Sequence, residues 1–320
     1  MMGCVSITKR CLTIQSDLVR GMLAELAGTF ILVLFVDGGL AQAFVSGWTS
    51  GTPVSTALTS GMGVAFGIYT GVGVSGGHVN PSITIGLASV GKFPWKRAPL
   101  WIAAQLVGAF SAAFVVFGIY YPGIDNLDGG NRTMFGSTGT AGIFSTYPQP
   151  YFGLWVGLAE QIINTGLLLH CTLVFFDEKN GKPPKGMEPF FVGLSVSMIL
   201  LTWGHNAGAP MNPARDFAGR LLTWVVGYGN QVWVPRGLHW WWIPTFVPLL
   251  GGICGAHFYV LFVERHHPKD THGGYYRDRP SMDEFAEMQP GNAQQTMNCL
   301  KHPSPTYDYE SHHVTGDESN

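Results

Sequence analysis

Six apolar runs that are long enough, or nearly long enough, to cross a lipid bilayer divide the chain. A spanning helix needs about 20 apolar residues, and a composition of 46% hydrophobic against 12% charged residues fits repeated crossings. We predict an all-α membrane protein in which a polar N-terminal tail, residues 1–18, and a disordered C-terminal tail, residues 266–320, flank a membrane domain at 19–265. Its six transmembrane helices are expected at 19–41, 56–74, 99–120, 154–176, 189–203 and 244–263.

Two further apolar runs, 83–90 and 213–224, are too short to span the membrane. Each follows an Asn-Pro pair, Asn80-Pro81 or Asn212-Pro213, which suits the N-cap and first position of a helix. The glycines and prolines before each pair prevent a continuous helix, and irregular backbone at membrane depth is tolerated where it lines a cavity. The pattern therefore predicts two re-entrant half-helices that begin inside the membrane.

The two halves of the chain repeat one plan. Glu25 and Glu160 each lie within an apolar run upstream of their own Asn-Pro pair. We predict an inverted repeat, with repeat one at about 19–120, repeat two at about 152–265 and a long external loop at 121–151. Matching broken segments of this kind place a site near the midplane.

These residues resemble a known family. The paired Asn-Pro motifs, Ser75-Gly76-Gly77-His78 before the first and Asn212-Pro213-Ala214-Arg215-Asp216 in the second are similar to the major intrinsic proteins. Asp216 after Arg215 favours the aquaglyceroporin branch. The resemblance covers roughly residues 20–268. It implies an aquaporin-like fold and a homotetramer in which each subunit has its own pore. It also implies structural support from Glu25, Glu160 and Asp216, with each glutamate accepting backbone N–H bonds from the broken segment of its own half.

The half-helices predict how a pore would treat solutes. Two helix N-termini that face each other raise the energy of a cation between them, protons included. Asn80 and Asn212 are expected to cap these ends while offering amide N–H donors to a solute oxygen. Arg215 is expected to add a fixed charge at the outer constriction, as it does in the resembled family. A ladder of acceptors is expected from the carbonyls of Gly76, Gly77, His78, Gly208, Ala209 and Pro210.

The outer constriction of the resembled family has four positions, which here hold Ser60, Leu200, Ala209 and Arg215. The bulky aromatic residues common there are missing, so a wider opening is expected. We therefore predict a passive channel for glycerol, water and urea or other small neutral solutes, with poor discrimination among them. Alternatives are a water-selective aquaporin and an ion-coupled transporter, whose ions Glu25, Glu160 and Asp37 could carry.

Several polar residues admit more than one role. We favour structural roles for the two glutamates over proton relay, and a hydrogen-bonded brace over a gate or ligand for His78. Asp37 is assigned no role. No nucleophile–base pair or metal-ligand spacing is evident, so no enzyme, catalytic residue, metal or cofactor is expected. A net charge of -2 argues against nucleic acid as a partner, which leaves the solutes and the lipid bilayer.

The distribution of Lys and Arg predicts the orientation. The first tail, the approach to the third span and the loop at 177–188 are rich in these residues, whereas the opposite loops carry few. Both termini are therefore expected in the cytoplasm, in a protein of the plasma membrane. Asn131 then lies outside, where Asn131-Arg132-Thr133 is a candidate N-glycosylation site. No disulfide is predicted from the five cysteines.

Overall fold

The computed structural model describes residues 14–268, and every regular element in that part of the chain is helical. Six of its helices are long and apolar enough to cross a membrane, as the hydrophobic runs predict. They are α2 (Asp17–Val45), α3 (Pro53–Ser75), α5 (Ala98–Asp128), α6 (Leu154–Phe176), α7 (Glu188–Ala207) and α9 (Trp242–Phe262). Short helical turns connect them: η1 (Trp95–Arg97), η2 (Ala141–Ile143), η3 (Trp224–Tyr228), η4 (Asn230–Val232), η5 (Pro235–Gly237) and η6 (Glu264–His266).

Two short helices begin at the Asn-Pro pairs: α4 (Pro81–Ser89) and α8 (Pro213–Thr223). The Asn80 side chain accepts the Ser82 N–H at 2.8 Å, and the Asn212 side chain accepts the Ala214 N–H at 3.1 Å. A proline occupies the first turn of each helix, where its missing N–H costs nothing. Both helices thus start where the sequence predicts.

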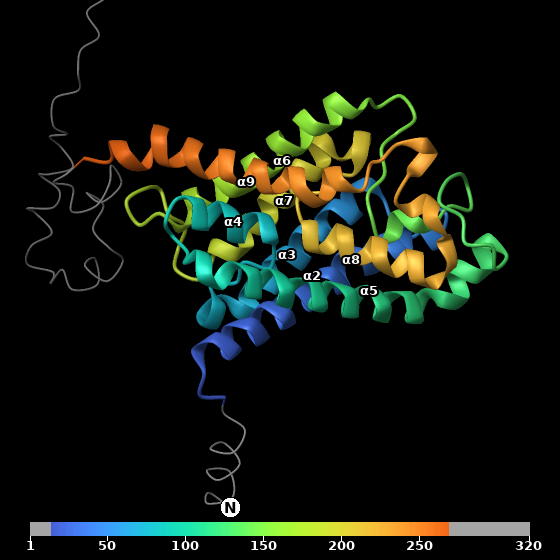
Figure 1. Cartoon of the computed structure of the whole chain (residues 1–320), viewed down its shortest axis with the longest axis horizontal. Helices are drawn as coiled ribbons and strands as arrows, with labels where there is room; N and C mark the ends of the chain where they lie inside the picture. The colour runs from blue at the N-terminus through green and yellow to red at the C-terminus, as the bar shows by residue number, and fades with distance from the viewer. Residues whose placement is uncertain (1–13, 269–320) are drawn as a thin grey trace, which may run out of the picture. The chain divides into compact units, whose positions relative to one another are not determined.

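Each half-helix packs against the other half of the chain. Helix α4 lies against α9, the last helix of the second half, and α8 lies against α5, the last of the first half. Figure 1 shows α4 and α8 between α5 and α9. Helices α3 and α7 also cross between the halves, at a point where a Cβ on Gly61 would come within 2.2 Å of the Gly193 carbonyl oxygen. Such close approach of small residues is how membrane helices associate.

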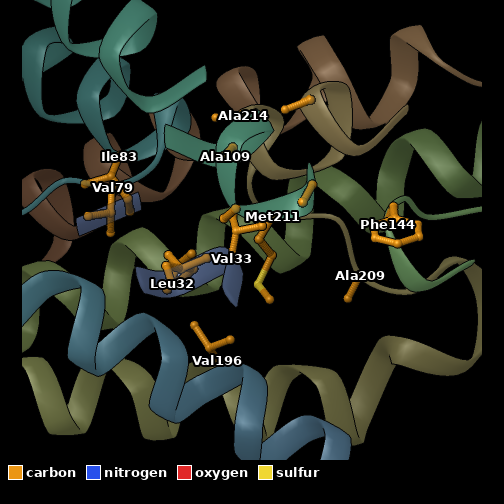
Figure 2. Packing of buried hydrophobic residues seen from close by; sticks show 14 of the residues in the cluster. Leu32, Val33, Val79, Ile83, Ala109, Phe144, Val196, Ala209, Met211 and Ala214 are labelled. Atoms are coloured by element: carbon orange, nitrogen blue, oxygen red, sulfur yellow. The ribbon is translucent and has the colours of Figure 1, made fainter. Parts of the chain in front are cut away.

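Buried apolar residues from several elements meet around the half-helices. Figure 2 shows Leu32 and Val33 on α2, Val196 on α7 and Met211 on the non-helical segment before α8. Leu32, Val196 and Met211 also line the central cavity described below, so the core and the cavity wall share side chains. Ala209 projects from the same non-helical segment.

Two helices, α5 and α7, end later than the sequence predicts. Helix α5 continues past Tyr120 and through Pro122 to Asp128, so the first part of the range expected to be an external loop is helical. A proline removes only one backbone bond, and membrane helices tolerate it; α5 instead ends at Gly129, whose φ is 63°. Helix α7 likewise reaches Ala207 rather than residue 203, and it ends at Gly208 with φ 75°.

The boundaries between the membrane domain and its two predicted tails also differ from the predictions. Helix α2 starts at Asp17, inside the range assigned to the N-terminal tail, because the Ser16 hydroxyl caps it. At the other end, His267 contacts the Asp177 carboxylate at 2.7 Å, so the membrane domain extends past 265. Of the tail predicted to be disordered, 266–320, only 266–268 is described; the rest falls outside the described residues, as do Cys4, Cys11 and Cys299.

Candidate functional site

The two Asn-Pro segments hold each other by reciprocal hydrogen bonds. The Asn80 side-chain amide donates to the Met211 carbonyl at 3.0 Å, and the Asn212 amide donates to the Val79 carbonyl at 2.9 Å. These bonds bring the N-termini of α4 and α8 together. A primary amide has two N–H groups. Each asparagine therefore uses its oxygen as a helix cap, one N–H to tie the half-helices together, and keeps one N–H for another partner.

A cavity of about 1410 Å³ passes this junction. Its wall includes Thr52 and Pro148 near one end and Lys92 and Lys179 near the other, so it follows the length of the helices. The six residues whose carbonyls were expected to form a ladder all line it: Gly76, Gly77, His78, Gly208, Ala209 and Pro210. Within the described part of the chain, none of their carbonyl oxygens accepts a hydrogen bond. These acceptors are available to a solute.

Glu25 on α2 shapes the segment before α4. One carboxylate oxygen accepts the Ser75 hydroxyl at 2.6 Å and the His78 N–H at 2.9 Å. The other accepts the Val79 N–H at 2.7 Å and the Gln105 side-chain amide at 2.7 Å. Glu25 is fully buried. Its two backbone bonds are of the kind that the family resemblance implies, and they satisfy donors that a broken helix leaves without partners.

His78 is fixed on several sides. Its Nδ1 lies 3.1 Å from the Thr84 hydroxyl, and its ring meets that of Phe93 edge-on at 4.6 Å. Gln105 also donates to the Thr84 hydroxyl at 3.1 Å. This geometry fits the interpretation of His78 as a brace of the non-helical segment.

Glu160 does not repeat the bonding of Glu25, which corrects the sequence expectation. Its carboxylate accepts the side-chain amides of Asn206 at 2.9 Å and Gln161 at 3.2 Å. Within the part of the chain that the structure describes, no backbone N–H from 208–211 donates to it. The reason is the length of α7, whose last turn places Asn206 beside the carboxylate.

Arg215, in the first turn of α8, is held by two elements. Its Nε and Nη2 lie 3.0 and 2.9 Å from the same oxygen of Asp37 on α2, and Nη2 also donates to the Ile143 carbonyl at 2.8 Å. The Arg215 side chain is 10% exposed and the residue lines the cavity. A cation therefore stands in the wall with part of its guanidinium reachable from the pore.

Asp216 fastens the loop after η2 to α8. Its carboxylate accepts the Thr146 N–H at 2.7 Å and hydroxyl at 2.5 Å. Arg220, fully buried, pairs with Asp216 at 2.8 Å and donates to the carbonyls of Thr146 and Val232. Asp216 thus supports the loop whose Ile143 carbonyl holds Arg215.

The three other residues assigned to the constriction also line the cavity: Ser60 on α3, Leu200 on α7 and Ala209 before α8. The Ser60 hydroxyl donates to the Thr56 carbonyl of its own helix at 2.7 Å. Leu200 is half-buried, and Ala209 has a φ of 44°. The structure thus brings all four candidate residues, Arg215 included, to the wall of one cavity.

Sequence reasoning missed three contributors to this site: Asp37, Arg220 and the carbonyl of Ile143. Asp37 carried a signal, because an acid within an apolar run is costly and calls for a partner. That partner is 178 residues away along the chain, so its identity could not be read locally. Arg220 gave a weaker signal four residues after Asp216, the spacing of a helical ion pair. The Ile143 carbonyl gave none.

At the end of the cavity opposite Arg215, polar contacts join residues of the cavity wall. Asp177 accepts the Lys179 N–H at 2.8 Å and the Tyr259 hydroxyl at 2.7 Å, and it contacts His267. Burial would raise the pKa of Asp177, but these hydrogen bonds outweigh it and hold that pKa below its usual value. Among the described residues, no group of three His, Cys, Asp or Glu side chains could hold a metal ion.

Six membrane-crossing helices around a continuous cavity that passes two opposed helix N-termini define a membrane channel. The chain matches the Major intrinsic protein family over residues 13–259 and belongs to it. It is 41% identical to aquaporin-10 of Homo sapiens over 258 residues, which cover 81% of this chain and 85% of that protein. With aquaporin-9 of Homo sapiens the identity is 40% over 261 residues, covering 82% and 88%.

A solved structure agrees. The X-ray structure of the aquaglyceroporin from Plasmodium falciparum matches with a TM-score of 0.68 and 32% sequence identity, covering 76% of this chain and 95% of that one. The chain is accordingly a passive channel of the aquaglyceroporin type and not an enzyme.

Proposed function

We propose that this channel conducts glycerol and water, and that its constriction also admits urea and other small neutral solutes while excluding ions and protons. The observation that carries the proposal is the pairing of donors with acceptors along one cavity. Asn80 and Asn212 each keep an amide N–H, and six carbonyls along the wall have no partner in the described chain. A neutral molecule with hydroxyl or amide groups can use both kinds.

The same arrangement disfavours ions. The N-termini of α4 and α8 meet at the Asn80 and Asn212 contacts, and each carries about half a positive charge. A cation at this junction would face both dipoles. A water or hydroxyl oxygen there can instead accept the free amide N–H groups, which turns the molecule and interrupts a chain of proton-conducting waters.

The solute range follows from small side chains at the constriction. Ser60 and Ala209 have small side chains, and the side chain of Leu200 has no polar group. The Ser60 hydroxyl already donates its hydrogen bond to the Thr56 carbonyl of its own helix. These side chains offer a solute few hydrogen bonds and leave an opening that excludes few small solutes by size. We propose that glycerol and urea therefore pass with little discrimination.

Ala209→Phe is expected to slow urea by about tenfold and water by less, because a ring added to the constriction wall excludes the larger solute first. The measurement is stopped-flow light scattering on proteoliposomes. Val156→Phe adds the same ring on α6 at a residue that is 61% exposed and does not line the cavity, so it should change neither rate. An unchanged urea rate in Ala209→Phe would mean that the constriction lies elsewhere.

We also propose that both termini are cytoplasmic, that the channel works in the plasma membrane and that four copies assemble. Many large apolar residues on α5, α6 and α9 are exposed, including Phe114, Trp155 and Phe262, and these faces suit lipid or neighbouring subunits. Asn131, exposed just beyond α5, would then carry a glycan.

Asn131→Gln is expected to remove a glycan-sized mass shift in cells without reducing glycerol transport, since Asn131 is not part of the cavity wall that holds Asn80 and Asn212. Mobility of the protein before and after glycosidase treatment measures the shift. Protease protection that places residue 131 on the cytoplasmic side would contradict the proposed orientation.

A further inference from the structure

Asp37 is a carboxylate with no exposed surface, on a helix that crosses the membrane. The Nε of Arg215 donates to the Oδ1 of Asp37 at 3.0 Å, and Nη2 lies 2.9 Å from the same oxygen. Its Oδ2 has no hydrogen-bond partner in the described chain. A buried acid at membrane depth is expensive, which makes Asp37 a candidate functional residue. Its sole partner among the described residues is the arginine of the constriction.

The contacts determine which edge of the guanidinium meets a solute. Nε and Nη2 are turned toward the wall, where Asp37 and the Ile143 carbonyl accept their N–H groups. Nη1 has no partner in the described part of the chain. Arg215 lines the cavity, whereas Asp37 does not. The two N–H groups of Nη1 are therefore the donors that Arg215 offers to the pore.

The contacts also determine the charge of the constriction. Arg220, the other arginine of α8, is paired with Asp216 at 2.8 Å. Arg215 is paired with Asp37 at 2.9 Å. Two opposite charges this close cancel at distances that are long compared with their separation. From a distance the pore therefore sees a nearly neutral ion pair, and a solute that reaches Arg215 meets the two N–H donors of Nη1.

We propose that Asp37 is a positioning residue for solute selection at the constriction. It holds the Arg215 guanidinium so that Nη1 faces the pore, and it cancels the arginine's charge. The constriction then selects by hydrogen bonding, and the rejection of cations is left to the opposed N-termini of α4 and α8. This inference rests on the proposed channel function and adds a specificity-determining residue to it.

In Arg215→Val, a cation leak is expected to depend on Asp37. Valine is shorter than arginine, so that substitution opens the Asp37 carboxylate to water of the pore, and a hydrated carboxylate without a counter-charge attracts cations. The leak of such a variant would come mainly from Asp37 and only secondarily from the loss of arginine. Removing the carboxylate as well should close the leak.

A double-mutant cycle tests this statement. Wild type, Asp37→Asn, Arg215→Val and the double variant are reconstituted, and potassium and proton leak is followed with entrapped dyes. Arg215→Val is expected to raise the leak by about tenfold or more, and the double variant should show less than half of that increase. A double variant that keeps half or more of the increase overturns the proposal, because the arginine alone would then reject cations. Asp125→Asn is the matched control: it removes a carboxylate from another Asp–Arg pair, away from the cavity, while Arg132 keeps Asp128 at 2.8 Å.

A second measurement does not depend on Arg215 variants folding. Asp37→Asn retains an oxygen that can accept the Nε proton, whereas Asp37→Leu retains none. The ratio of glycerol to water permeability should therefore fall by about threefold or more in Asp37→Leu and by less in Asp37→Asn. Water permeability in each variant reports that the channel is folded. An Asp37→Leu ratio equal to wild type overturns the positioning role. If the proposed glycerol function is wrong, the wild-type protein itself will not conduct glycerol. The cation-leak comparison would then still test the role of Asp37.

Discussion

Glu25→Gln is expected to destabilise the channel severely, far more than Glu160→Gln. In Glu25 both oxygens are acceptors, and each receives one backbone N–H, from His78 or from Val79. A glutamine has only one oxygen, so its amide NH2 group must face the donors that the other oxygen accepted. A buried backbone N–H, from His78 or from Val79, then faces another donor. Each unpaired donor costs on the order of 1–3 kcal/mol, and the loss of the carboxylate charge weakens the bonds that remain.

Glu160→Gln is the matched control for that prediction. The donors to Glu160 are the side-chain amides of Asn206 and Gln161, which can turn to present an oxygen instead. Thermal loss of monodispersity in detergent, followed by size-exclusion chromatography, compares the two variants. Equal sensitivity of the two variants would show that the backbone bonds of Glu25 do not set the shape of the segment before α4.

Gly219→Ala is expected to disrupt the constriction through the loop that holds Arg215. A Cβ on Gly219 would lie 1.9 Å from the Phe144 carbonyl oxygen and 2.7 Å from its carbon, so the backbone of this buried residue must move. Ile143, the residue before Phe144, holds Arg215 through its carbonyl, and Thr146, two residues after Phe144, donates to Asp216. Overpacking of this kind costs about 1–3 kcal/mol or more. Glycerol permeability and the unfolding temperature should both fall.

Gly118→Ala separates this steric effect from the general effect of adding a methyl group to a membrane helix. Gly118 lies on α5 with nothing within 4 Å of its Cβ position. Alanine favours the helix over glycine by about 1 kcal/mol. Stability should therefore stay equal or rise slightly. If Gly219→Ala behaved like Gly118→Ala, the loop would not be seated on α8 as described.

Local sequence was enough to predict the parts of this site that a short segment encodes. Asn80 and Asn212 predict helix starts, because an asparagine followed by a proline suits the N-cap and the first turn of a helix. Both half-helices are found at these positions. The six long helices follow from apolar runs whose length matches a bilayer.

Boundaries and distant partners were harder to predict. The range around Pro122, Asp125 and Asp128 was expected to be a loop, but α5 continues through it, and Arg132 folds back to pair with both aspartates. The repeat made Glu160 look equivalent to Glu25, whereas the longer α7 gives it a different donor. The pairing of Asp37 with Arg215 depends on how the two halves pack, which no local pattern encodes.

The most direct test of the central claim is a stopped-flow comparison of water, glycerol and urea on proteoliposomes that contain the wild-type protein. The account predicts that all three move faster than through empty liposomes, with no dependence on an ion gradient. Fast water combined with a glycerol rate no higher than that of empty liposomes would contradict it, because the donors of Asn80, Asn212 and Arg215 would then serve a water-selective pore.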